Sequence, residues 1–575
     1  MATVLTTPDN APQGLDGFEQ ELRAVLEPRL ALAPGELQFE RPRQDGVGEF
    51  ALPCFRFASA AGKNPAALAG ELAEFLRGKG YDAQPAGPFL NVRLDGAALA
   101  AAVLRDARLP DYGAARDGRT TIVEFSSPNI AKPMHIGHLR STVIGAALAR
   151  MFARLGHRVV RINHLGDWGS QFGKLVAAWN RWGAESELER APIEHLLGLY
   201  VRYHAEESAD PGLAAEAQRA FQDLESGSDN PTRSAWKRFT TLSLREFDKT
   251  YARLGVQFDF VRGESWYEDR LGPLVAWLDS RGVLEESDGA QIVRLDALGI
   301  KTPCLVKTAH ATTLYATRDL AAAKSRWEEF AFDQALYVVG NEQSLHFQQF
   351  KGVLARCGAA WQERIEHIPF GLIRLAEGKL STREGRVLQL SDVLDRAVEL
   401  ARAAVEEKNP EHPDKAGAAE KVGIGAVLFH DLKHQRTKDV VFDWKEVLSF
   451  EGDTGPYLQY THARCCSILR KAGRPAPESA RVDAALIAAE GRDLLVALGR
   501  FPAALREAAA KREPMILAQA LLKIGAAGNS WYRENRVLGA EPPALEDARL
   551  ALVDALRCAL ANGLGLLGVP VPEEM

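Results

Sequence analysis

Two histidines that flank a glycine are the residues best suited to chemistry on a nucleotide. They occur in His135-Ile136-Gly137-His138, where a predicted loop leads into a predicted helix. The free N–H groups and partial positive charge of a helix N-terminus attract phosphates. Glycine lets a flat base approach the backbone, and histidine donates hydrogen bonds to phosphate oxygens as charge develops. The motif therefore predicts a site that binds and cleaves a nucleoside triphosphate.

A second reactive segment joins basic and hydroxyl side chains between two glycines. It reads Lys379-Leu380-Ser381-Thr382-Arg383, flanked by Gly378 and Gly385, and it follows a predicted strand. Lysine and arginine here would neutralise pyrophosphate as it leaves. Alone, the segment is typical of a solvated charged loop. Together with the histidine motif, it favours a site that cleaves ATP.

The elements that must position these residues are those of a doubly wound parallel sheet. A β-branched run over 120–125 predicts a buried strand, followed by a loop, a helix from about His138 and another strand over 159–162. Strands return over 335–339 and 365–373. Ligands of such α/β sheets bind at the carboxyl ends of the strands. We therefore predict an α/β, Rossmann-like catalytic domain with helical insertions.

The chain divides into four predicted regions. Residues 1–110 form a small α+β N-terminal domain, with strands over 50–57 and 89–94 and a helix from Pro65 to about Lys79 capped by Asn64. Residues 111–400 form the catalytic domain, interrupted by a helical insertion at about 179–300. A connecting helical segment follows over 401–454, and an all-α bundle over 455–575.

Composition narrows the class of protein. The 575 residues are 46% hydrophobic and 25% charged, as in ordinary globular enzymes. The first 14 residues contain no Lys or Arg, so they do not resemble a targeting peptide, and no run of about 18 uncharged apolar residues predicts a membrane span. We expect a cytoplasmic protein. The six cysteines form no C-x-x-C pair, so no protein-bound structural metal is expected.

A family resemblance emerges from the wider signature region. The segment 127–142, SPNIAKPMHIGHLRST, resembles that of the arginyl-tRNA synthetases, a class I family. The KLSTR segment resembles the family's K-M-S-K-S motif, with Thr382 in place of the second lysine; Lys132 occupies the position of an upstream lysine thought to compensate. The resemblance runs from about Gly48 to Met575 and includes Gly87-Pro88-Phe89-Leu90-Asn91 and Asp554-Ala555-Leu556-Arg557, the letters of the DALR-type anticodon-binding domain.

The resemblance implies ATP-dependent activation of L-arginine to arginyl-adenylate and transfer to tRNA(Arg), yielding arginyl-tRNA, AMP and pyrophosphate. It implies that ATP arrives with Mg²⁺, that the first step needs bound tRNA, that the N-terminal domain contacts the corner of the tRNA, and that the enzyme is a monomer. The implied catalytic residues are Lys132, His135, Gly137, His138, Lys379, Ser381 and Arg383.

An arginine pocket must hold a planar, permanently charged group with five N–H donors, which carboxylates bind well. By resemblance, Glu264, Tyr315 and Asp319 face the guanidinium, and Tyr315 and Asp319 share one face if their segment is helical. Asn129, Glu124 and Gln343 match positions that hold the backbone end of the amino acid. Core packing, surface ion pairing and a strand end remain simpler interpretations of these residues.

Aromatic residues among arginines in the C-terminal helices suit stacking on unpaired bases. The alternative is a helical core with an ordinary arginine rim. The candidate tRNA-binding residues are Tyr457, Tyr460, Arg464, Trp531, Tyr532 and Arg536.

Two other functions stay open. The chain could be another class I synthetase or nucleotidyl transferase that carries H-x-G-H. It could also be a former synthetase retained as an RNA-binding protein, although that history predicts damaged signature residues and these are intact. The net charge of −6 counts mildly against a nucleic-acid partner.

Overall fold

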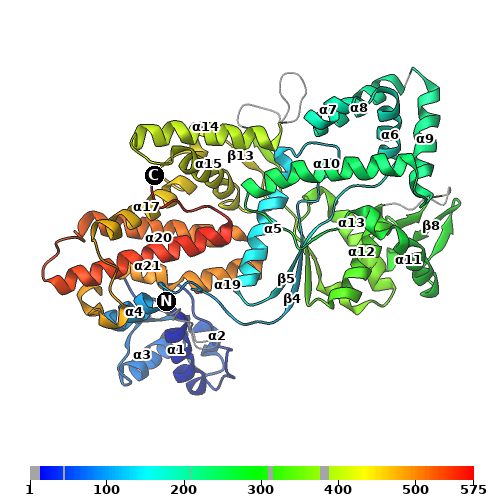
Figure 1. Ribbon diagram of the computed structural model, residues 1–575. Helices are drawn as coiled ribbons and strands as arrows, with labels where there is room; N and C mark the ends of the chain where they lie inside the picture. Colours follow the sequence, from blue (N-terminus) through cyan, green and yellow to red (C-terminus); the bar gives the residue numbers. More distant parts are fainter. Residues whose placement is uncertain (1–12, 43, 45, 208, 309–314, 376–387) are drawn as a thin grey trace.

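A five-stranded parallel sheet forms the centre of the computed structural model, which describes residues 13–42, 44, 46–207, 209–308, 315–375 and 388–575 (Figure 1). Its strand order is β11-β10-β4-β5-β6, and every neighbouring pair is parallel. The strands are β4 Thr120–Glu124, β5 Arg158–Asn163, β6 Phe260–Val261, β10 Gln334–Tyr337 and β11 Ile365–His367. The predicted doubly wound sheet is confirmed. Strand order reverses between β4 and β10, which is where such sheets bind ligands.

Helix α5, Ile136–Arg154, follows β4 and is buried along most of its length. Gly145 allows this contact, because a Cβ there would lie 2.2 Å from the Phe125 side chain. Its buried Arg140 forms an ion pair with Asp431 at 2.8 Å, and donates to the carbonyl of Gly371 at 2.9 Å. The helix that begins in the histidine motif is therefore packed against the end of β4 at Phe125 and is held by Gly371 and by Asp431 of the later helix Lys415–Leu432.

The insertion between β5 and β6 is helical, but the predicted helical region of about 179–300 is wrong in its second half. Helices α6 Ser170–Trp182, α7 Glu185–Arg190, α8 Pro192–Glu207, α9 Pro211–Glu225 and α10 Pro231–Arg253 precede β6. After α11, Glu268–Ser280, an antiparallel sheet forms from β7 Glu285–Ser287, β8 Ala290–Val293 and β9 Cys304–Lys307. Asp288 and Gly289 both have positive φ in the two-residue β7–β8 turn, an Asp-Gly hairpin signal that the prediction overlooked.

The strand predicted over 365–373 is two strands. β11 ends at His367, and β12, Ile373–Leu375, pairs instead with β13, Val440–Phe442. Gly371 lies between them, where an added Cβ would come within 2.5 Å of the Lys438 backbone, so two chain segments cross closely here. The remaining helices of this half are α12 Tyr315–Phe330, α13 Ser344–Arg356, α14 Leu390–Lys408, α15 Lys415–Leu432 and α16 Trp444–Val447.

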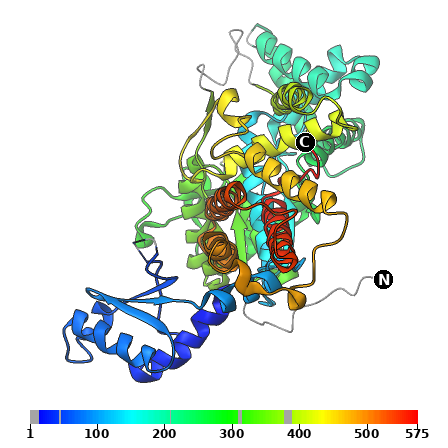
Figure 2. The same cartoon turned by 90° about the vertical axis from the view of Figure 1, so that its left-hand side faces the viewer.

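The N-terminal domain projects from the body of the molecule (Figure 2). Its antiparallel sheet has the order β1-β3-β2, and Asn64 caps α3 by accepting from the Ala66 N–H, as predicted. The strand predicted over 50–57 stops at Pro53, because residues 55–58 form a short helix. The elements are α1 Asp16–Arg29, β1 Phe50–Pro53, α2 Phe55–Ala58, α3 Pro65–Arg77, β2 Asp82–Ala86, β3 Phe89–Arg93 and α4 Gly96–Asp106.

The C-terminal helices pack as a bundle beside α5 (Figure 1). They are α17 Gly455–Lys471, α18 Arg492–Gly499, α19 Phe501–Lys511, α20 Pro514–Glu534 and α21 Pro543–Leu567. Among the described residues, α21 alone has the length and mean hydropathy, 1.6, of a membrane span. However, 72% of that window is buried within the protein, and α21 carries an Asp554–Arg557 ion pair. It is accordingly a core helix of the bundle.

Candidate active site

The histidine motif lies where strand order reverses in the parallel sheet. His135 is the N-cap of α5, so the motif occupies the helix N-terminus after β4. His135 Nδ1 accepts from the Gly137 N–H at 3.1 Å, and His138 Nδ1 accepts from the His135 N–H at 3.1 Å. In the neutral rings the proton therefore resides on Nε2, which is left to donate to a ligand. The predicted position at a loop–helix junction is confirmed.

Both rings are held in their neutral form. Burial lowers the pKa of His135, and burial together with the adjacent His135 lowers the pKa of His138 to about 4. The two ring centroids lie 3.9 Å apart. Gly137 permits the capping geometry, because a Cβ there would lie 2.8 Å from the His135 ring. The site thus presents two neutral N–H donors beside a helix N-terminus, which suits phosphate binding.

The segment that contains Lys379, Ser381 and Arg383 lies outside the described residues, but both of its flanks are described. β12 precedes it, and residues 388–390 follow it alongside the histidine motif. Gln389 forms an isolated antiparallel β-bridge with His135. On either side of it, the Ile136 N–H donates to Leu388 O at 3.1 Å, and the Leu390 N–H donates to Met134 O at 2.8 Å. The chain leaving the predicted loop is therefore attached to the start of α5.

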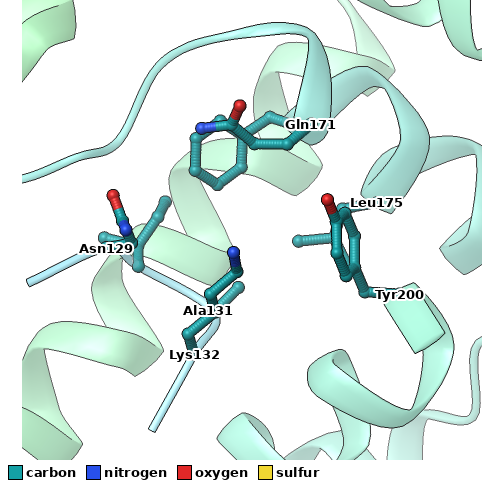
Figure 3. Close-up of a pocket in the computed structure, with 8 residues that line it drawn as sticks. Asn129, Ala131, Lys132, Gln171, Leu175 and Tyr200 are labelled. Atoms are coloured by element: carbon teal, nitrogen blue, oxygen red, sulfur yellow. The ribbon is translucent and has the colours of Figure 1, made fainter. Parts of the chain in front are cut away.

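Lys132 lies in the loop between β4 and α5, three residues before His135. It is exposed, and its Nζ lies 5.3 Å from the centre of the Tyr200 ring of α8. Figure 3 shows Lys132 in a small pocket with Asn129 on one side and Tyr200 on the other. Asn129 is exposed and forms an isolated parallel β-bridge with Gly166. A Cβ added at Gly166 would lie 1.8 Å from Asn129 Oδ1. The pocket joins the loop after β4 to the helical insertion.

The predicted arginine-binding carboxylates lie close enough to repel one another. Burial and the charge of Asp319 raise the pKa of Glu264 to about 8, with Asp167 contributing further and Arg318 opposing. Asp319 Oδ2 is 2.7 Å from His346 Nε2, and its Oδ1 is 3.6 Å from His164 Nε2. The repulsion between the two carboxylates, added to the effect of burial, keeps Glu264 protonated near neutral pH. A cation bound near both would relieve this repulsion and favour their ionised forms.

Glu124 lies in a different environment from the other predicted carboxylates. It ends β4 and forms a buried ion pair with Arg326, a residue of α12 that is 0% exposed. Its charge is therefore balanced within the protein. Gln343 is exposed at the end of a short 3-10 helix, Asn341–Gln343, beyond β10. Tyr315 is the first residue of α12, and its side chain lies outside the described part of the chain.

The sequence analysis missed the loop after β5, residues 164–169. His164 approaches Asp319, Gly166 contacts Asn129, and the buried Asp167 accepts from the N–H and Oγ of Ser265, next to Glu264. The available signal was a run of polar and glycine residues directly after a predicted strand, at the sheet edge where ligands bind. No group of three metal-ligating side chains occurs among the residues with a described position.

The candidate tRNA-binding residues separate into a surface group and a core residue. Tyr460 and Tyr532 are 37% and 38% exposed, and the Arg464 guanidinium lies 4.8 Å and 5.5 Å from their ring centres. The Tyr457 hydroxyl accepts a hydrogen bond from Asn529 Nδ2, and Arg536 is exposed. Trp531 is only 4% exposed and packs in the bundle core, so the structure corrects its assignment as a stacking surface.

Three family models match consecutive parts of the chain. Residues 16–94 match the arginyl tRNA synthetase N terminal domain, and residues 99–444 match the catalytic domain of tRNA synthetases class I (R). Residues 458–575 match the DALR anticodon binding domain. The models cover nearly the whole chain in the order that the structure presents.

Relatives agree over similar lengths. An arginine–tRNA ligase of Clostridium acetobutylicum is 43% identical over 541 residues, covering 93% of this chain and 95% of the relative. One from Latilactobacillus sakei is 44% identical over 93% of this chain and 95% of its own length. The structure of Thermus thermophilus arginyl-tRNA synthetase superposes with a TM-score of 0.82 at 30% identity, covering 97% of this chain and 99% of that one. The chain therefore belongs to the arginyl-tRNA synthetase family of class I aminoacyl-tRNA ligases, which charge tRNA(Arg) with arginine in an ATP-dependent reaction.

Proposed function

We propose that the crevice at the carboxyl ends of β4, β5 and β10 carries out both steps of arginine charging. The observation that carries the proposal is that two groups lie around the ends of the parallel strands: two neutral N–H-donating histidines at the start of α5, and two carboxylates. Glu264 follows β6, and Asp319 lies near the start of α12, where His164 from the loop after β5 approaches it. One group suits a triphosphate and the other suits a guanidinium. Activation of arginine needs both ligands side by side.

In the first step, an oxygen of the arginine carboxylate attacks the α-phosphorus of ATP. The bond from the α-phosphorus to the bridging oxygen breaks, giving arginyl-adenylate and pyrophosphate. No enzyme nucleophile is needed, so the protein contributes positioning and electrostatic stabilisation. His135 and His138 donate from Nε2 to the phosphates, and Lys132 adds positive charge from the loop before α5. Lys379, Ser381 and Arg383 are assigned to the leaving pyrophosphate by family resemblance.

Arginine is held at its two ends. Asp319 and Glu264 receive the guanidinium, joined by Tyr315 on the strength of the resemblance. Asn129 and Gln343 hold the α-amino and carboxylate groups. Glu124 supports that end indirectly, because its carboxylate is already engaged by the buried Arg326.

In the second step, the terminal ribose hydroxyl of the tRNA attacks the activated carbonyl carbon, and AMP leaves with the C–O bond electrons. The helical bundle holds the anticodon, with Tyr460, Arg464 and Tyr532 as the stacking surface and Tyr457 and Arg536 beside it. Mg²⁺ enters as part of the ATP complex, and we assign no protein residue to it. We further propose that the enzyme works as a cytoplasmic monomer, as its family resemblance suggests; sedimentation equilibrium tests the oligomeric state.

The decisive experiment is ATP–pyrophosphate exchange with each of the twenty amino acids, with and without total tRNA. Exchange with arginine alone, appearing only when tRNA is added, is the expected result. Exchange with another amino acid would mean that the enzyme recognises a side chain other than that of arginine. Folded protein without exchange under any condition would contradict the proposal.

A further inference from the structure

The loop after β5 holds the segment that carries Glu264 at two successive residues. The Glu264 N–H donates to Leu165 O at 3.0 Å. One residue further, Ser265 donates to both oxygens of the Asp167 carboxylate, from its N–H at 2.9 Å and from its Oγ at 2.7 Å. Glu264 is the first residue of a short 3-10 helix, Glu264–Tyr267, which runs directly into α11. The backbone that carries Glu264 is therefore held by residues 165–167 on one side and continues into α11 on the other.

The approach of Asp167 is also fixed by sterics. A Cβ on Gly263 would lie 2.3–2.4 Å from the Asp167 carboxyl carbon and oxygens, so only glycine leaves room for the carboxylate. Gly263 has extended backbone, with φ −76° and ψ 178°, which any residue can adopt. Glycine is therefore required here for space and not for an unusual backbone conformation. Asp167 itself is 4% exposed, and its carbonyl accepts from Trp236 Nε1 of α10 at 2.8 Å.

Asp167 is costly to maintain as a structural residue. Burial raises its pKa. Among the described residues, no Lys or Arg forms an ion pair with Asp167. Neutral donors from Ser265 satisfy its oxygens, and the nearby His164 also opposes the rise of its pKa. A buried carboxylate with such limited compensation points to a requirement at the site next to it.

We propose that Asp167 is a positioning residue for arginine: by holding Ser265 and fitting against Gly263, it sets the place of Glu264 opposite Asp319. The two guanidinium-binding carboxylates come from segments far apart in the chain, so their spacing is not fixed within either segment. The loop of residues 164–167 supplies that spacing, because His164 approaches Asp319 while Asp167 holds the Glu264 segment. The inference rests on the proposed role of Glu264 in binding arginine.

The test is Asp167→Asn, assayed by tRNA-dependent pyrophosphate exchange. We expect the KM for arginine to rise by about tenfold or more, and the KM for ATP to stay within about twofold, because misplacement of a binding group by about 1 Å weakens catalysis by up to 10²-fold. Ser265→Ala, which removes one of the two hydrogen bonds, should change the arginine KM in the same direction by a smaller factor, and it serves if Asp167→Asn does not fold. The matched control is Asp259→Asn, a carboxylate hydrogen-bonded to Arg161 beside β6.

A pH profile separates positioning from simple destabilisation. Glu264 is faced by Asp319 and Arg318 from α12 and by Asp167 from the loop, while His164 and His346 face Asp319. Loss of the Asp167 charge should lower the pKa that governs arginine binding, moving the acid limb of the arginine KM profile to lower pH. An unchanged arginine KM and acid limb in both variants overturns the inference. If Glu264→Gln also leaves the arginine KM unchanged, the proposed role of Glu264 fails as well, which distinguishes the two failures.

Discussion

The proposed arginine pocket and the aromatic surface of the helical bundle place charged side chains in opposite surroundings. In the pocket, Glu264 and Asp319 are partly withdrawn from water, and the pKa of Glu264 is raised to about 8 by burial and by Asp319. On the bundle, Arg464 lies between two exposed tyrosine rings. Desolvation strengthens electrostatic interactions, whereas exposed pairs are screened. In the proposed function, one region therefore selects a single small cation, and the other adds modest contacts to a large anion.

The two regions also differ in how their residues are brought together. Tyr460 and Arg464 lie one helical turn apart on α17, and Tyr532 comes from the adjacent α20. Asp167, Glu264 and Asp319 come from a loop, a 3-10 helix and α12. A helix presents its surface without help from distant segments, but the pocket exists only when the separate elements pack correctly. Single substitutions should consequently have large effects in the pocket and small effects on the bundle.

The largest effect is expected for Asp319→Ala. Removing one partner of a desolvated charge pair costs about 3–5 kcal/mol, so the KM for arginine should rise by about two to four orders of magnitude. Steady-state pyrophosphate exchange measures it. Asp395→Ala is the matched control, because Asp395 pairs with Arg253 and is 69% exposed. An arginine KM near the wild-type value would remove Asp319 from the pocket.

Lys132→Ala should come next, with adenylate formation reduced by about 10²-fold while arginine binding survives. Loss of a preorganised charge at the reacting phosphates weakens the transition state more than the ground state. Pyrophosphate exchange and equilibrium dialysis with labelled arginine measure the two quantities separately. Lys249→Ala, at an exposed lysine of α10, provides the control. Near-normal exchange by Lys132→Ala would refute its role.

The pocket should also show a pH dependence that the bundle lacks. In the proposed pocket, arginine pairs with the ionised form of Glu264, so below a pKa of about 8 each bound arginine must displace a proton. The KM for arginine should then rise by up to about tenfold per pH unit as pH falls from 8 towards 6, since each unit below the pKa leaves about tenfold less of the carboxyl ionised. Glu264→Gln should flatten the profile. A flat wild-type profile over this range would show that Glu264 does not govern binding.

The smallest effects are expected on the bundle. Tyr460→Ala and Tyr532→Ala should each raise the KM for tRNA by about fivefold, because an exposed base–aromatic stack contributes about 1 kcal/mol at the low end of its range. The KM for arginine should not change. Trp531→Phe is the control, since that ring is in the core and its replacement should leave the tRNA KM alone. Equal effects of all three variants would indicate a loss of stability instead of a lost contact.

Much of the catalytic domain could be predicted because its signals are local. β-branched runs marked β4 and β5, and the histidine motif marked the start of α5. Predictions failed where distant segments decide the outcome. The break between β11 and β12 arises from the close crossing of Gly371 over Lys438, and the burial of Trp531 arises from packing within the bundle. The Asp288-Gly289 hairpin was a local signal that was available and overlooked.

The sequence by itself determined where the candidate nucleotide-binding residues lie: histidines and a glycine at a helix N-terminus after a buried strand. Only the tertiary structure decided which carboxylates meet one another. Glu124 is engaged by Arg326, Asp167 by Ser265 and Asp319 by His346, while Glu264 lies near enough to Asp319 for its pKa to rise. The physical reason is one of range. Helix caps and strand patterns depend on neighbours along the chain, whereas ion pairing and pKa depend on groups that only folding brings within a few ångströms.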